Sequence, residues 1–275
     1  MQAIRTITWR LIAVAFVALF FSAFWPKFLG GENSGSRLSE QAVIATYVAF
    51  AFGLVMPFRF LKIPATLTHE VGHALMSSLL GGKVNNIRVE IDESGVTWSK
   101  YKLNRFRVFF VSASGPLCNA AFFLLTMNLV VHNLSQYWII FTLISVVLIT
   151  ITTVRSVWGW ATATFIAFVL LSSLTKSLNL TSDVNTFANV GLWSNSAINL
   201  AVVFTAYTAA IEFRYAWMVR NPQSPNQDES RVSMALGVSP RIGGRLLVLV
   251  NLIFIALAFS HALGWENLWT PGSFL

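Results

Sequence analysis

Two histidines and a glutamate stand at a spacing that could hold and use a metal ion. His69-Glu70-Val71-Gly72-His73 is an H-E-x-x-H motif within an apolar stretch. On a helix, positions i and i+4 lie on one face, so both imidazoles can point to one ion. Glu70 can accept a proton from water without binding the metal itself. The motif predicts a zinc site with ligands His69 and His73 and general base Glu70; a pair of core histidines is the structural alternative.

A third ligand must come from elsewhere in the chain, because a catalytic zinc usually has three protein ligands and one position for water. The three aspartates are Asp92 at an expected turn, Asp228 in a polar stretch, and Asp183 between two apolar segments. A carboxylate at membrane depth is costly and is therefore a candidate functional residue. We expect Asp183 to be the third ligand. The alternatives are a helix-cap role for Asp183 and Glu212 as the rival carboxylate.

The other residue types that bind metals are few. Of the four histidines, only His132 and His261 lie outside the motif, and both fit interfacial or structural positions better than ligand positions. Cys118 is the single cysteine, which excludes an intrachain disulfide and a cysteine-based zinc cluster. It fits a small packing residue, since no histidine lies near it in the sequence.

The composition predicts a membrane protein. Of the 275 residues, 55% are hydrophobic and 11% are charged, whereas a soluble domain has about 25% charged residues. We expect an all-α polytopic membrane bundle of about 7–8 apolar helical segments, most of them near the length that crosses a bilayer. They would form one membrane-embedded domain over residues 1–275. The segments are 11–25, 42–58, 64–80, 108–131, 137–154, 158–174, 190–211 and 246–263.

The charged residues predict how the chain crosses the membrane. The net charge is +8. If the N-terminus is cytoplasmic and segment 64–80 does not cross fully, most basic residues fall on the cytoplasmic side, as the positive-inside rule expects. No soluble module carries a basic patch, so nucleic-acid binding is not indicated. The first apolar segment lacks a small-x-small cleavage site, so we expect it to stay as a helix. The basic residues on the expected cytoplasmic side are Arg5, Arg10, Arg59, Lys62, Arg155, Arg214, Arg220, Arg231, Arg241 and Arg245.

Two polar stretches interrupt the apolar pattern. In residues 81–102, apolar positions such as Ile87 and Val89 alternate before a glycine-containing turn. This pattern predicts a β-hairpin directly after the metal-binding helix, with a solvated loop as the alternative. Residues 213–245 form the longest polar stretch. We expect a flexible cytoplasmic loop there, followed by a final helix over 246–263.

Three motifs resemble the site-2 protease family of intramembrane zinc metalloproteases, in its compact form without an inserted PDZ module. They are residues 69–74 with Gly81-Gly82 after them, Ser114-Gly115-Pro116-Leu117-Cys118-Asn119 opening the next helix, and Ser182-Asp183. They cover a core of residues 60–211. The resemblance implies a metalloprotease domain with Zn²⁺ held by His69, His73 and Asp183.

The resemblance also implies a catalytic role for Asn119. In this family the asparagine faces the active site, where it can hold the substrate backbone or the developing oxyanion. Gly115 and Pro116 allow a tight turn into a helix, which would place Asn119 one turn inside it. A polar contact between helices is the alternative.

Together these features predict an enzyme that hydrolyses peptide bonds of transmembrane or membrane-anchored proteins in or near the bilayer. Glu70 would take a proton from a zinc-activated water and return it to the leaving amine. The substrate must be unwound or extended, and the hairpin at 84–98 could offer an edge strand for pairing. One alternative is a membrane metallopeptidase of another family that cleaves soluble peptides, with a third ligand such as Glu212. The other is a non-catalytic scaffold or transporter.

Overall fold

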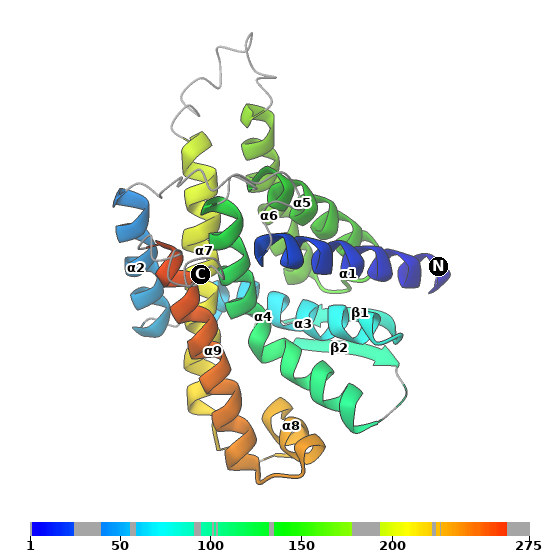
Figure 1. The fold of residues 1–275 in the computed structure, drawn as a ribbon. Coiled ribbons are helices and arrows are strands. Elements are labelled where there is room, and N and C mark those ends of the chain that lie inside the picture. The colour runs from blue at the N-terminus through cyan, green and yellow to red at the C-terminus, as the bar shows by residue number, and fades with distance from the viewer. Residues whose placement is uncertain are drawn as a thin grey trace, which may run out of the picture.

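The protein is mostly helical in the computed structural model, as expected from the sequence (Figure 1). The structure describes residues 2–24, 40–55, 59–90, 95–100, 102, 104–131, 135–177, 193–221, 224–225 and 227–262. The described part contains nine helices and one hairpin. They are α1 (Gln2–Phe24), α2 (Glu40–Val55), α3 (Arg59–Leu79), β1 (Lys83–Val89), β2 (Gly95–Lys100), α4 (Arg105–Val131), α5 (Ser135–Thr152), α6 (Val157–Ser177), α7 (Trp193–Met218), α8 (Asp228–Leu236) and α9 (Pro240–Ala262).

Three of the described helices are long and apolar enough to cross a membrane. They provide the spans Gln2–Phe20 in α1, Arg105–Val130 in α4 and Pro240–His261 in α9. Shorter apolar helices occur in α2, α5 and α6. The larger number of membrane segments expected from the sequence stays a prediction.

Helix α4 occupies the middle of the bundle. Figure 1 shows it between the group of α2, α7 and α9 and the group of α1, α5 and α6. Phe123 and Met127 of α4 are fully buried in one core cluster with Val202 and Ala206 of α7 and Ala258 of α9. Small residues at the last two positions let the helix backbones approach closely, which stabilises helix packing in membranes.

Helix α3 carries the H-E-x-x-H motif and packs against α1, α4 and the hairpin. Ile63 and Leu75 share a buried cluster with Trp9 of α1 and with Ile87 of β1. The helix ends where Gly81 adopts a positive φ of 80°, a conformation that glycine adopts without steric cost. The Gly82 amide then donates to the Ser77 carbonyl at 2.8 Å, which turns the chain back toward the helix.

The hairpin expected from the sequence is confirmed. Strands β1 and β2 pair antiparallel, with Ile87 opposite Thr97 and Val89 opposite Gly95. On its other side β1 is bonded to the end of α5, since the Ile87 amide donates to the Thr153 carbonyl at 3.1 Å. Strand β1 therefore lies inside this small sheet, and β2 is its outer strand among the described residues.

The polar stretch 213–245 differs from the flexible loop expected there. Helix α7 continues to Met218, α8 covers Asp228–Leu236, and α9 begins at Pro240. Val232 explains why α8 is ordered, because it is fully buried against Ala113 of α4 and Leu247 of α9. Burial of one apolar side chain stabilises such docking by about 1.5–3 kcal/mol. Because most residues of the stretch are polar, this contribution is not evident from its composition.

The motif around Gly115 and Pro116 also lies elsewhere than expected. It does not open a helix, because α4 begins at Arg105 and runs unbroken through both residues. Pro116 removes one backbone donor inside this helix. Asn119 therefore lies near the middle of α4 rather than in its first turn, facing α3 and α7.

Candidate metal centre

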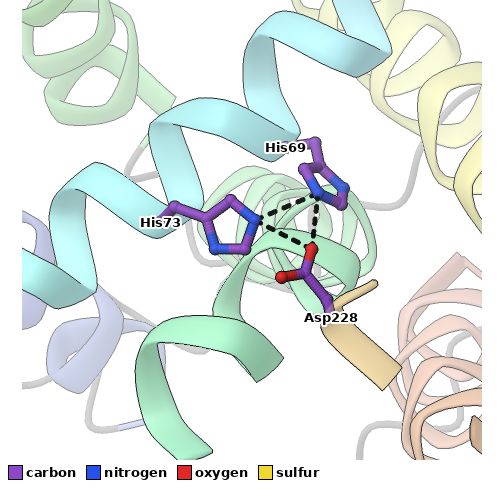
Figure 2. A group of neighbouring side chains, drawn as sticks. All are labelled: His69, His73 and Asp228. Carbon is purple, nitrogen blue, oxygen red and sulfur yellow. Dashed lines mark hydrogen bonds and ion pairs between the residues drawn. The ribbon is translucent and has the colours of Figure 1, made fainter. Parts of the chain in front are cut away.

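Three side chains converge at the face of α3 that meets α4 and α8 (Figure 2). Nε2 of His69 and Nε2 of His73 are 3.2 Å apart. Oδ2 of Asp228, at the start of α8, lies 3.3 Å from the first nitrogen and 3.0 Å from the second. The expected meeting of the two histidines on one helix face is thus present in the structure, with an aspartate from a distant segment beside them.

These spacings fit a tetrahedral zinc ion. Zinc binds nitrogen and carboxylate oxygen at about 2.0–2.2 Å in tetrahedral geometry, so two such ligand atoms stand roughly 3.3 Å apart. The three measured separations of 3.0–3.3 Å are close to that value. Two imidazoles and a carboxylate are also the donor types that zinc prefers. His69, His73 and Asp228 could therefore hold zinc and leave a fourth position free.

The hydrogen bonds to the other ring nitrogens turn both imidazoles toward this centre. His73 donates from Nδ1 to the Val111 carbonyl of α4 at 2.6 Å. His69 donates from Nδ1 to Oε1 of Glu212 on α7 at 3.0 Å. With hydrogen on Nδ1, each Nε2 presents a lone pair toward Asp228. Three lone pairs that face one another repel unless a cation or proton lies between them.

Glycines let the neighbouring helix approach the motif. A Cβ on Gly115 of α4 would overlap the His73 ring and would lie 2.7 Å from Nε2 of His69. A Cβ on Gly72 of α3 would lie 2.7 Å from Cβ of Cys118. Both positions need a residue without a side chain because α3 and α4 are in direct contact there. Cys118 is buried at this contact and serves in packing, as expected from the sequence.

Glu70, the general base expected from the sequence, lines the same cavity as His69. It is buried, with 6% of its surface exposed, and it lines a cavity of about 410 Å³ together with His69 and Asp228. Strand β2 covers it closely: a Cβ on Gly95 would lie 2.6 Å from Oε1 of Glu70. The Thr97 hydroxyl donates to the Glu70 carbonyl at 2.9 Å. The hairpin therefore fixes the helix backbone at the motif.

Asn119 is fully buried and connects three helices. Its Nδ2 donates to the Ala65 carbonyl of α3 at 3.0 Å and to Oε2 of Glu212 at 3.2 Å. This is the polar interhelical contact that the sequence left open as an alternative. The role of Asn119 toward substrate stays a prediction.

The expected third ligand, Asp183, lies outside the described residues. Its role stays a prediction, and among the described residues Asp228 has the ligand position beside the histidines. The sequence offered one signal for Asp228. Acidic residues 228–229 precede Val232, Leu236 and Gly237, a pattern typical of a short helix with acidic residues at its start and glycine after its end.

The two carboxylates at the start of α8 have different environments. Burial by itself would raise the pKa of Asp228. When protons on Nε2 take the place of a cation, the charge of His73 and hydrogen bonds from both imidazoles hold this pKa below its usual value. Burial raises the pKa of Glu229 to about 7, and the charge of Asp228 adds to the rise. Asp228 is thus kept ionised, as a metal ligand must be, while Glu229 holds its proton up to a higher pH than an ordinary carboxyl group.

Comparison with known proteins identifies a family. The family described as Peptidase M50B-like matches residues 41–258, a range that holds the H-E-x-x-H motif, the hairpin, Asn119 and Asp228. The searches of curated proteins and of solved structures returned no match. The match covers well over half of the chain and agrees with the apolar helices and with the motif resemblance. The chain is therefore a membrane protein of the Peptidase M50B-like family, in agreement with the resemblance to the site-2 proteases.

Proposed function

We propose that the protein is an intramembrane zinc metalloprotease that hydrolyses peptide bonds of transmembrane or membrane-anchored proteins. The observation that supports this most directly is the convergence of two Nε2 atoms and one carboxylate oxygen within 3.0–3.3 Å of one another. Glu70 borders the same cavity. A purely structural pair of histidines would not need a carboxylate, that of Asp228, within hydrogen-bond distance of Nε2 of both rings.

The residues divide the chemistry among them. When bound by His69, His73 and Asp228, zinc supplies a positive charge that acidifies a water molecule and polarises the scissile carbonyl. Glu70 accepts the proton of the attacking water and gives it to the departing amine. Glu212 holds the His69 ring in the orientation that ligation needs. Asn119 positions Glu212 from the other side.

The surroundings of the site favour an extended peptide segment as substrate. A helix hides its backbone in internal hydrogen bonds, so a transmembrane substrate must unwind before a carbonyl can be attacked. Strand β2 runs beside Glu70 through Gly95 and Thr97, and β1 uses its own second edge to bond residues 153–155. An unwound segment could pair with the outer edge of β2, as peptides do with exposed sheet edges.

The test compares the wild-type protein with Glu70→Gln in the same membranes. Proteomic comparison should reveal membrane proteins that are cleaved only by the wild type, and purified zinc-loaded protein should cleave the same segments. Glu70→Gln should keep its zinc and its fold, while cleavage falls by about 10² or more. Equal cleavage by a folded, zinc-loaded Glu70→Gln protein would contradict the proposal. Cleavage of soluble peptides alone would contradict the proposed class of membrane-protein substrates and favour a membrane metallopeptidase that acts on soluble peptides.

A further inference from the structure

Two basic side chains line the same cavity as the metal-binding and catalytic residues. Lys62 lies two turns before His69 on α3, and Arg214 lies on α7 two residues after Glu212. Neither residue takes part in the chemistry proposed above. The positive-inside rule accounts for basic residues in these parts of the chain, but it does not account for the place of these two side chains in the lining of the cavity.

Arg214 has a buried donor that the described residues leave unsatisfied. Its Nη1 is shielded from solvent and has no hydrogen-bond partner in the described part of the chain. A buried polar group without a partner costs free energy, more so when it is charged. Most buried donors in folded proteins have a partner. Arg214 lines the reaction cavity and carries a guanidinium nitrogen without a partner among the described residues, which points to a ligand group that arrives from outside.

Four acids line the cavity, of which Glu229 is buried at the start of α8. The other three are bonded or packed elsewhere. Glu212 bonds His69 and Asn119 through its two oxygens. Asp228 faces both imidazoles. Glu70 lies against β2. None of these hydrogen bonds or close contacts involves Arg214 among the described residues.

We propose that Arg214, assisted by Lys62, binds a carboxylate of the substrate near the scissile peptide bond, so that the enzyme prefers segments with Asp or Glu at that position. The inference rests on the proposed proteolytic function and narrows its substrate class. Guanidinium groups match carboxylates in a bidentate fork, and the pairing is strong in a site of low dielectric constant. Once Arg214 is removed, the four acids that line the cavity would repel an acidic segment.

The experiment measures peptide binding separately from cleavage. Fluorescein-labelled apolar peptides carry one Asp, moved along the segment from peptide to peptide, and each has a twin with Asn at that position. Binding to zinc-loaded Glu70→Gln protein in zwitterionic detergent is followed by anisotropy. At least one Asp peptide should bind roughly ten- to a hundredfold tighter than its twin. In Arg214→Gln protein this preference should be lost, so that the Asn twin binds as tightly as the Asp peptide or more tightly.

Arg220→Gln is the matched control. Arg220 lies two residues after the end of α7, and its guanidinium donates to the Trp217 carbonyl and stacks over the Trp217 ring, outside the cavity. This variant should keep the full preference for Asp. Arg214→Lys should keep part of it, because the charge remains and the fork is lost. If Arg214→Gln fails to fold, Lys62→Gln must lower the preference by itself.

Equal binding of all twins, or an unchanged preference in folded Arg214→Gln, would overturn the inference. Arg214-dependent binding of phosphatidylglycerol with no discrimination between twins would also overturn it, and would assign the cation to a lipid headgroup. The same peptides offered to wild-type protein test proteolysis independently. Discrimination without cleavage would refute the proposed protease while the carboxylate site stands. Cleavage of Asp peptides and Asn twins alike, with no difference in binding, would support the proposed protease and refute the carboxylate site.

Discussion

Nδ1 of His69 lies 3.0 Å from Oε1 of Glu212, a residue 143 positions further along the chain. The second oxygen of Glu212 accepts a hydrogen bond from Asn119 at 3.2 Å. One buried carboxylate thus connects α3, α4 and α7 at the candidate metal centre. A carboxylate that receives the N–H of a metal-binding histidine selects its tautomer, fixes the ring and increases its basicity as a ligand.

We expect Glu212→Gln to lower zinc affinity about 10- to 100-fold, the usual cost of losing such a partner. The amide keeps an acceptor oxygen for His69 but loses the charge, and its NH2 group then faces the donor Nδ2 of Asn119, so we expect a folded protein of somewhat lower stability. Zinc affinity is measured by competition with a fluorescent chelator, and folding by thermal unfolding of the metal-free protein. Unchanged zinc affinity in a folded variant would show that Glu212 is a packing residue only.

The third ligand can be decided by two parallel substitutions. Asp228→Ala should lose zinc and activity, because it removes the carboxylate that lies 3.0 Å from Nε2 of His73. Asp183→Ala should keep full zinc occupancy if Asp228 completes the ligand set. Zinc content by elemental analysis, measured beside activity, compares the two. Zinc loss in Asp183→Ala with full occupancy in Asp228→Ala would restore the expectation from the sequence.

Gly115→Ala should disturb the ligands directly. The added methyl group would overlap the His73 ring, so the helices must separate or the imidazoles must move, at a cost of about 1–3 kcal/mol in stability. Gly72→Ala is the control, because its methyl group would meet Ser114 and Cys118 in the same helix interface without touching a ligand. At similar loss of stability, zinc affinity should fall further in Gly115→Ala. An equal fall in both would attribute the effect to helix spacing alone.

The topology follows from the distribution of Lys and Arg. We expect the N-terminus and the α8 region to lie on the cytoplasmic side, as the positive-inside rule requires. Single cysteines introduced at each place in a Cys118→Ser background can be labelled with an impermeant maleimide in intact cells and in inverted vesicles. Both should be labelled from the cytoplasmic face. Labelling of the two places from opposite faces would contradict this topology and show that at least one helix crosses the membrane in a different way than expected.

The sequence by itself determined the local chemistry. The i, i+4 spacing of His69 and His73 places both rings on one helix face wherever the helix lies, because helix geometry depends on a few neighbouring residues. The hairpin is equally local, since alternating apolar positions around a glycine-containing turn encode it directly. The composition indicated a membrane protein for the same reason: long apolar helices are stable only where lipid or protein covers them.

Only the tertiary structure decided which distant residues complete the site. Asp228 lies in a polar stretch that resembles a loop, and it reaches the histidines because Val232 docks α8 between α4 and α9. Glu212 is a rival third ligand by sequence alone, yet in the structure it is buried against Nδ1 of His69, on the side of the ring away from Asp228. Gly115 looked like a turn residue, and it is the position where α4 contacts His69 and His73. Each outcome depends on how helices pack over long sequence separations, and packing of that kind has no local pattern from which it could be predicted.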